Sequence, residues 1–238
     1  MEFVEGEIPA DVPSYAASGW VHDATDQQRA ALWQSGIEFL VRLHQLDWRE
    51  LGLGQLQLAS SGADDLEKTL NYSIDLFRLE AGGQSSPIIE RAIAWLRANR
   101  PLPDRSCVCW GDARIGNIIW QKFKPIAFID WDMSTIACPG VDLGWWSFFH
   151  RWSTFGQGHP DLGGMCVGQP LANLYQACGG SHIENLCYYE ILATVKGLSV
   201  WLRMYRLMRA DGKLPEMNPL DDNIHMVRVL RLLMDQAD

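Results

Sequence analysis

Three oxygen-bearing side chains that could do chemistry together, those of Asp112, Asn117 and Asp130, fall within residues 107–131, CVCWGDARIGNIIWQKFKPIAFIDW. A carboxylate held near a hydroxyl group can take its proton. Amide and carboxylate oxygens are also ligands that Mg²⁺ accepts, with water and phosphate oxygens completing its octahedron. The stretch therefore predicts a general base beside a magnesium site, and no His or Cys with zinc-ligand spacing accompanies it.

The spacing of these side chains points to one type of reaction. Asp112 precedes Asn117 by five positions, and Arg114 follows Asp112 by two. The kinase catalytic loop, H-R-D-x-x-x-x-N, has the same Asp-to-Asn spacing; its Asp takes the proton of the substrate hydroxyl and its Asn holds a magnesium ion. The loop thus predicts transfer of a phosphoryl group to a hydroxyl.

A β-hairpin follows the loop. β-rich runs at residues 118–121 and 126–129 are separated by residues 122–125, which include a proline. A turn centred between Phe123 and Lys124 would pair the two runs as antiparallel strands.

This hairpin would bring the expected metal ligands together. With that turn, Ile119 faces Phe128 and Asn117 faces Asp130, with Cβ atoms roughly 4.5 to 5.5 Å apart. Asp132 would point the same way if the strand continued, adding a second carboxylate near the ion. A register slipped by one residue would instead send Asn117 and Asp130 to opposite faces.

The elements that must position this unit are mainly helical. Residues 1–24 have no sustained periodicity and two prolines, which indicates a hinge or connector, so residues 25–238 form the main lobe. A further short strand is expected at residues 107–110. Apolar residues at helical spacing predict helices over residues 25–47, 66–81, 87–100, 141–150, 170–178, 184–209 and 219–235.

Composition excludes several classes of function. The net charge is −9 and no Lys/Arg cluster lies along one face, so a nucleic-acid partner is not expected. No run approaches the roughly 20 apolar residues of a membrane span, so we expect no membrane partner and a soluble, cytoplasmic protein. The six cysteines have no C-x-x-C pair and are expected as reduced, mostly buried thiols.

Taken together, five segments resemble the aminoglycoside phosphotransferase and choline-kinase-like family: MEFVEGEIPADVPSY, LHQLDW, WGDARIGN, IDWD and PGVDLGWW. Within it, the chain is similar to bacterial proteins related to the kinase-like domain of certain acyl-CoA dehydrogenases. The resemblance covers nearly the whole chain. It implies a mainly helical α+β fold, the C-terminal lobe of a protein-kinase-like enzyme with a small antiparallel hairpin. It also implies transfer of the γ-phosphoryl group of ATP to a hydroxyl of a small metabolite or antibiotic.

The resemblance agrees with the roles that the spacing indicates. Asp112 matches the family's catalytic base, and Asn117 and Asp130 match its Mg²⁺ ligands. Each of the three alone could equally be a turn-forming residue that closes a hairpin.

Further roles rest on the resemblance alone. Arg114 matches a cation near the transferred phosphate, although a surface ion pair would look the same. Asp142 matches an aspartate that braces the catalytic loop, although an acidic residue at a helix N-terminus is also stabilised by the helix dipole. Glu2 to Val4 match the linker that meets adenine through its backbone.

The chain departs from the family pattern in two places. Trp110 stands where the family usually has His, and we expect packing to replace a polar brace there. Lys68 is the only lysine before Asp112 and lies in a helical pattern, and no G-x-G-x-x-G follows a strand. We therefore expect the N-terminal β-lobe to be absent from this chain and to be supplied upstream or in trans.

Two other functions stay open. The chain could be a non-catalytic remnant or binding module that keeps this fold without the nucleotide-binding lobe. A metal-dependent hydrolase is disfavoured because no second cluster of ligands accompanies the carboxylates.

The acceptor is not readable from the sequence: the negative net charge suits a cationic aminoglycoside or choline, whereas the resemblance favours a hydroxyacyl compound or another small metabolite.

Overall fold

The computed structural model describes residues 3–102 and 105–237. Helix accounts for 51% of the structure and strand for 7%, which confirms the mainly helical α+β class. The expected helices are all present, but the last one begins at His225 rather than at residue 219. The described α-helices are α1 (Asp26–His44), α2 (Asp65–Ala81), α3 (Pro87–Ala98), α4 (Gly140–Ser153), α5 (Gln169–Ala177), α6 (Leu186–Ala210) and α7 (His225–Ala237), and the short 3₁₀ turns are η1 (Gly54–Leu56), η2 (Ile115–Asn117) and η3 (Phe155–Gln157).

Local sequence signals set several of the helix ends. At the start of α1, Thr25 and Gln28 form a capping box in which each side chain accepts the other residue's backbone N–H. The Asp64 side chain accepts from the backbone of Glu67 and caps α2, and Gly82 ends that helix in the left-handed region. These signals explain why the helical ranges were predictable.

The strands form two separate two-stranded antiparallel sheets. β1 (Cys107–Cys109) pairs with β4 (Thr135–Ala137), and β2 (Ile118–Gln121) pairs with β3 (Lys124–Phe128). β4 was not expected from the sequence. Because β4 pairs with β1, the loop that follows β1 and the turn that precedes β4 lie next to each other.

The register of the β2–β3 hairpin differs from the expected one. Ile119 pairs with Ala127, whereas Phe128 was expected opposite it. The chain turns in two residues, at Lys122 and Phe123, both of which have positive φ angles of 50° and 63°. This two-residue turn moves the centre of the hairpin one residue earlier, and an irregularity in the pairing between Ile119 and Trp120 offsets part of that shift, so Ile119 is one residue out of the expected register.

The expected pairing of Asn117 with Asp130 is therefore wrong. The N–H of Ile129 donates to the carbonyl of Asn117 at 3.0 Å, and β3 has already ended at Phe128. Asp130 has a φ of 59°, so the strand does not continue through it. Asp132, which was expected to extend the same face of the strand, is exposed on the turn that follows.

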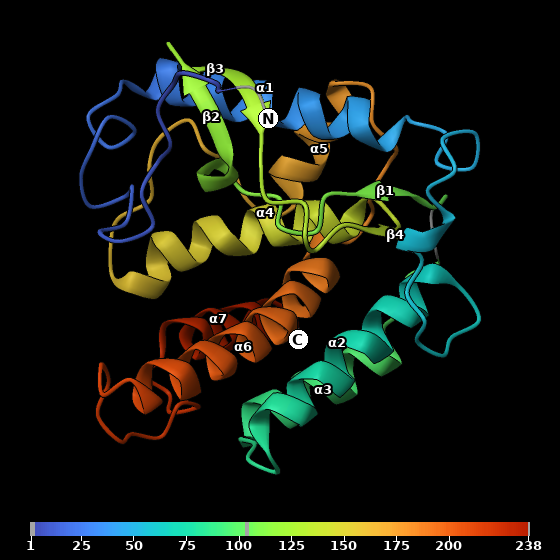
Figure 1. The fold of residues 1–238 in the computed structure, drawn as a ribbon, viewed down its shortest axis with the longest axis vertical. Helices are drawn as coiled ribbons and strands as arrows, with labels where there is room; N and C mark the ends of the chain where they lie inside the picture. The colour runs from blue at the N-terminus through green and yellow to red at the C-terminus, as the bar shows by residue number, and fades with distance from the viewer. Residues whose placement is uncertain (1–2, 103–104, 238) are drawn as a thin grey trace.

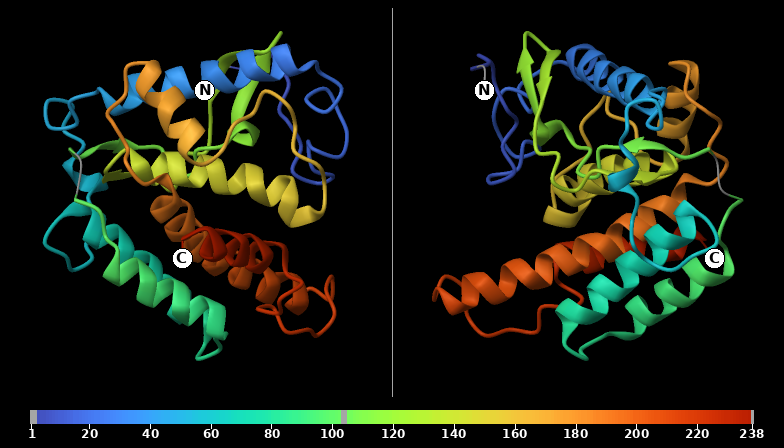
Figure 2. Two further views of the ribbon diagram at one scale, coloured as in Figure 1. Left: turned by 180° about the vertical axis from the view of Figure 1, so that it is seen from behind. Right: turned by 45° about the vertical axis from the view of Figure 1, so that its right-hand side comes forward.

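Figure 1 shows the helices in three tiers. α1, α5 and the β2–β3 hairpin lie on one side, α4 crosses the middle, and α6 lies on the other side with α2, α3 and α7 around it, as the two views of Figure 2 also show. α6 contacts α2, α3, α4 and α7, and one hydrophobic cluster runs through the tiers. None of the described helices has the length and apolar character that a membrane span requires.

The N-terminal segment packs against the hairpin. The backbone N–H and C=O of Glu7 bond with those of Trp120, both at 2.8 Å. Tyr15 and Val21 are buried in the core. The described part of this segment therefore lies along β2, and its Asp11 contacts the loop that carries Asp112 through an ion pair with Arg114.

Candidate active site

Asp112 follows a tight turn after β1. Gly111 has a φ of 86°, and a Cβ at this position would overlap the carbonyl of Met133, so the turn requires glycine. Asp112 is 8% exposed. Its Oδ1 accepts a hydrogen bond of 2.7 Å from the indole N–H of Trp145 on α4.

The other carboxylate oxygen of Asp112 is fully engaged. Its Oδ2 accepts from Nδ2 of Asn117 at 2.6 Å and from Nε of Arg114 at 3.2 Å. Each carboxylate oxygen has about two acceptor sites, so Oδ2 is filled and Oδ1 retains one. Because the amide nitrogen of Asn117 faces Asp112, the amide oxygen is the atom that Asn117 can offer to a cation.

Arg114 links the loop to the N-terminal segment. Its Nη1 donates to Oδ2 of Asp11 at 2.6 Å, and its guanidinium lies 4.7 Å from the ring centroid of Phe149. The side chain is thus held between two carboxylates, Asp11 and Asp112, in a partly buried position. This arrangement fixes both Arg114 and the carboxylate that it contacts.

Asp142, at the start of α4, holds the backbone just before Asp112. Its carboxylate is fully buried and accepts from the N–H groups of Trp110 at 2.7 Å and Gly111 at 2.8 Å. It also contacts Nε2 of His44 at 3.1 Å. Burial, the largest single effect, lowers the pKa of His44, but the hydrogen bonds and charges of Asp142 and Cys109 together outweigh it and raise that pKa to about 9.

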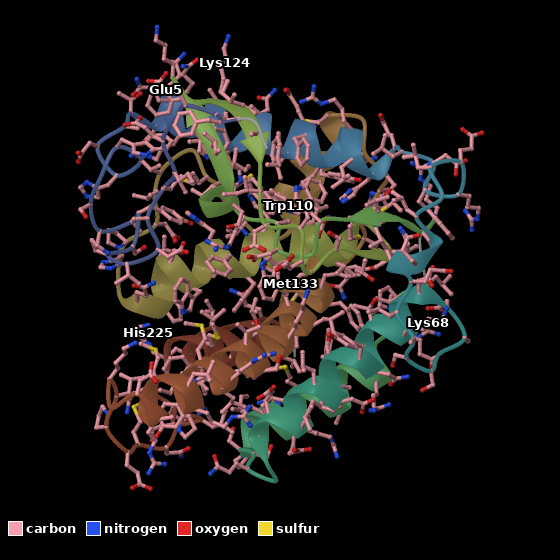
Figure 3. The ribbon with its side chains drawn as sticks, in the orientation of Figure 1. Glu5, Lys68, Trp110, Lys124, Met133 and His225 are labelled. Atoms are coloured by element: carbon pink, nitrogen blue, oxygen red, sulfur yellow. The ribbon has the colours of Figure 1, made fainter. Side chains whose placement is uncertain are left out.

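Trp110 makes a polar contact that the sequence did not suggest. Packing alone was expected at this position. The ring is fully buried, but its N–H also donates to the carbonyls of Ile129 at 3.1 Å and Asp130 at 3.0 Å. The indole therefore ties the strand before the loop to the turn that carries Asp130 (Trp110 is labelled in Figure 3).

The structure does not draw all of the expected ligands together. Asp112, Arg114 and Asn117 are joined by hydrogen bonds, whereas Asp130 and Asp132 are exposed and their carboxylates bond to none of these three among the described residues. Asn117 and Asp130 are nevertheless on adjacent backbones, through the bond from Ile129 to Asn117. An amide oxygen and an unpaired, exposed carboxylate form a donor set that fits Mg²⁺.

Two side-chain contacts at the site were not predicted from the sequence. Trp145 lies three residues after Asp142 on α4, and this helical spacing could have indicated a shared face. Lys196 on α6 donates from Nζ to the carbonyl of Gly111 at 3.1 Å. Its signal was a single charge inside the apolar run ILATVKGLSVW, where a lysine is rarely buried without a partner.

A second group of possible ligands lies behind the loop. Within the described ranges, His44, Cys107 and Cys109 are the one set of three or more His, Cys, Asp or Glu whose ligand atoms all lie within 4.8 Å of one another. Both ring nitrogens of His44 are already bonded, to Tyr175 and Asp142, and burial raises the pKa of both thiols. Cys107 and Cys109 are therefore described as packed, protonated thiols and not as metal ligands.

The expected nucleotide linker is only partly visible. Glu2 lies outside the described residues, and Val4 is partly buried in the N-terminal segment. A cavity of about 330 Å³ lies elsewhere, at the start of α2, and is lined by Asp64, Lys68 and Arg105 among others. None of the residues around Asp112 lines that cavity.

Comparison with sequence families gives one match over most of the chain. The family model described as "Phosphotransferase enzyme family" matches residues 1–166. Among curated proteins, mouse acyl-CoA dehydrogenase family member 11 is 30% identical over 217 residues, which is 87% of this chain and 26% of that protein. The human protein of the same name is 27% identical over 206 residues, 82% of this chain and 25% of that protein. The chain thus spans about a quarter of the length of these relatives.

Solved structures share the fold at low sequence identity. A candidate aminoglycoside phosphotransferase from Ralstonia eutropha has a TM-score of 0.74 and 18% identity, covering 100% of this chain and 71% of that one. Macrolide 2'-phosphotransferase from Brachybacterium faecium has a TM-score of 0.58 and 15% identity, covering 94% and 68%. A choline/ethanolamine kinase family protein from Mesorhizobium loti has a TM-score of 0.56 and 16% identity, covering 88% and 64%.

Proposed function

The chain belongs to the phosphotransferase enzyme family, and on this basis we propose that it is the catalytic lobe of an ATP-dependent kinase that phosphorylates a hydroxyl group of a small molecule. The observation that carries the proposal is the setting of Asp112. Three donors hold its carboxylate, and one acceptor site on Oδ1 remains open. A fixed carboxylate with one open acceptor site is suited to orient a hydroxyl group and take its proton.

Each residue of the site has a part in the proposed reaction. The acceptor hydroxyl donates to Oδ1 of Asp112 and loses its proton there as its oxygen attacks the γ-phosphorus of ATP. The bond from that phosphorus to the β–γ bridging oxygen breaks, and ADP leaves. Asn117 and Asp130, with Asp132 close by in sequence, would hold Mg²⁺, which when bound neutralises charge on the phosphates.

Other residues would position the reacting groups. Arg114 keeps donors beyond those bonded to Asp11 and Asp112, and these could meet the transferred phosphate. Asp142 would brace the loop through Trp110 and Gly111. The backbone from Glu2 to Val4 would meet adenine.

A nucleotide-covering lobe completes the proposal. It would be β-rich, would supply a lysine for the ATP phosphates, and would be carried upstream or in trans. The coverage of 71% of the Ralstonia eutropha structure, which is longer than this chain, supports this part of the proposal.

The first prediction tests the two carboxylates. In the form of the protein that turns over ATP, Asp112→Asn and Asp130→Ala should each lower phosphoryl transfer by about 10²-fold or more, because one loses the base and the other a ligand of the metal. Asp75→Asn, at an exposed position on α2, is the matched control and should keep full activity. Near wild-type turnover in either site variant would overturn the assignment.

Calorimetric titration with Mg·ATP separates this enzyme from a non-catalytic remnant. Nucleotide binding that is absent or weak in this chain, and clear once a β-rich lobe is supplied, supports the kinase. If neither form binds nucleotide, the chain is a binding module that has kept the fold alone.

A further inference from the structure

A cavity of about 170 Å³ opens beside the candidate active site. Its wall combines α2, the turn after β3 and α6, and it includes the side chains of Thr69, Tyr72, Ser73, Asp132, Met133 and Lys196. Met133, which lines this cavity, is labelled in Figure 3. Hydroxyl groups, the carboxylate of Asp132 and the ammonium of Lys196 form the polar part of this wall.

Lys196 and Asp132 are the charged side chains on this wall, and no ion pair joins them among the described residues. The ammonium of Lys196 has three donors, and the structure accounts for one of them, in the bond to the carbonyl of Gly111. The Nζ atom also lies 4.8 Å from the ring centroid of Trp145. Among the residues that the structure describes, no carboxylate forms an ion pair with it.

A group bound in the cavity would change the stability of the charged form of Lys196. Burial lowers the pKa of Lys196, and the more distant charges of Asp142 and Asp112 only partly oppose this effect. Lys196 is partly buried, and a cation in such a position with open donors is stabilised most by an anion with oxygen acceptors. The hydroxyl groups of Thr69 and Ser73 cannot supply that charge, and the carboxylate of Asp132 on the same wall forms no ion pair with Lys196 among the described residues.

Lys196 is also close to the expected point of reaction. It bonds to Gly111, the neighbour of Asp112 in the chain, and it lies over the ring of Trp145, whose N–H holds Asp112. Asp132, on the turn of the expected metal site, lines the same cavity. A molecule with one end at Lys196 would lie next to the backbone of Gly111. Asp112 is not among the residues that line the cavity, so the hydroxyl group of that molecule would have to extend beyond the cavity to meet Oδ1.

We propose that Lys196 binds an anionic group of the phosphoryl acceptor, so that the acceptor is a hydroxyl compound that carries a carboxylate or a phosphate. This inference rests on the proposed kinase function and adds the class of its substrate. It disfavours aminoglycosides and choline, because Lys196 would repel a cationic group placed beside it and the carboxylate of Asp132 on the same wall is assigned to the proposed metal site. The net charge of the whole chain is negative, but salt screens distant surface charges. The charge of Lys196 therefore has more influence on a group bound in the cavity than the net charge has.

The same ammonium could instead meet a phosphate of the nucleotide. Competition between Mg·ADP and an anionic hydroxyl compound distinguishes an anion of the acceptor from a phosphate of the nucleotide. If the anion site belongs to the acceptor, Mg·ADP and an anionic hydroxyl compound bind together. If it belongs to the nucleotide, Mg·ADP displaces the anionic compound.

The test measures binding, which does not depend on turnover. The full chain, with the nucleotide-covering lobe where that form is available, is titrated by NMR or calorimetry with matched pairs of probes. Lactate and 3-hydroxybutyrate are each compared with the diol of the same skeleton, glycerol 3-phosphate is compared with glycerol, and ethanolamine and choline serve as cationic probes. Lys196→Met removes the charge at similar length, Lys196→Arg restores a charge, and Lys213→Met is the control at an exposed lysine.

The expected result is that at least one anionic probe binds about tenfold or more tightly than its neutral partner. Lys196→Met should remove this preference, Lys196→Arg should restore part of it, and Lys213→Met should leave it unchanged. The proposal is overturned if no anionic probe is preferred, if the preference survives in Lys196→Met, or if Mg·ADP displaces the anionic probe. The two proposals are tested by different measurements. Phosphoryl transfer in Asp112→Asn tests the kinase function, and the binding preference for anionic probes tests the role of Lys196.

Discussion

The carboxylate of Asp112 is held by donors from three parts of the chain. Asn117 and Arg114 come from its own loop, and Trp145 comes from α4. The spacing of Asp112 and Asn117 made their contact predictable, because both lie on one short loop. Trp145 and Lys196 were not predictable in the same way, since their contacts with the loop arise only when α4 and α6 pack beneath it.

His44 should make the stability of the protein depend on pH. Its pKa is about 9 in the folded protein, against about 6.5 when unfolded. Folding therefore gains from the protonated ring below about pH 6.5, and this gain is lost as the pH rises through about 9. His44→Gln keeps a donor but cannot titrate, so the difference in unfolding free energy between wild type and variant should shrink by on the order of 3 kcal/mol across this range.

Urea denaturation at pH 6, 7.5 and 9 would measure this difference. His182→Gln, at an exposed histidine, is the control and should show no comparable trend. A difference that stays constant or grows with pH would mean that His44 is neutral in the folded protein.

At the scale of elements, the hairpin shows what a sequence pattern leaves open. The two β-rich runs were correctly located, but the turn was placed one residue too late in the chain. The actual turn needs positive φ at Lys122 and Phe123, which neither residue type favours. The ring of Phe123 packs edge-on against Trp20, with centroids 5.5 Å apart, and this contact with the N-terminal segment helps to hold the turn.

Lys122→Asn should stabilise the hairpin. Asn tolerates the left-handed conformation better than Lys does, so the free energy of unfolding should rise by about 0.5 to 1 kcal/mol. Lys124→Asn, two positions later in β3, should be neutral or destabilising because a strand does not favour Asn. Thermal denaturation of the two variants checks the prediction, and equal effects at both positions would contradict it.

At the scale of the whole molecule, the close approach of α4 and α6 unites the site. α4 carries Asp142 and Trp145, and α6 carries Lys196. The helices can come this close because Gly144 faces the backbone of Tyr189. Figure 2 shows α6 running beneath α4 in both views. The separation of these two helices therefore sets the distance from Lys196 to the loop.

Gly144→Ala should disrupt this arrangement. A Cβ at this position would overlap backbone atoms of Tyr189, which cannot rotate away, so the helices must separate. We expect a loss of about 1 to 3 kcal/mol in the free energy of unfolding, measured by chemical denaturation. Gly54→Ala, where an added Cβ meets no atom within 4 Å, is the control. A wild-type midpoint for Gly144→Ala would show that α4 and α6 are not rigidly packed.

The sequence by itself determined the fold class, the ranges of most helices and the loop that carries Asp112 and Asn117. These features depend on neighbours in the chain: caps, helical periodicity and a spacing of five residues. Tertiary structure alone decided the hairpin register, the exposed positions of Asp130 and Asp132, and the convergence of Trp145 and Lys196 on the loop. These depend on contacts between distant segments, such as Phe123 with Trp20 and Gly144 with Tyr189, whose geometry no local pattern encodes.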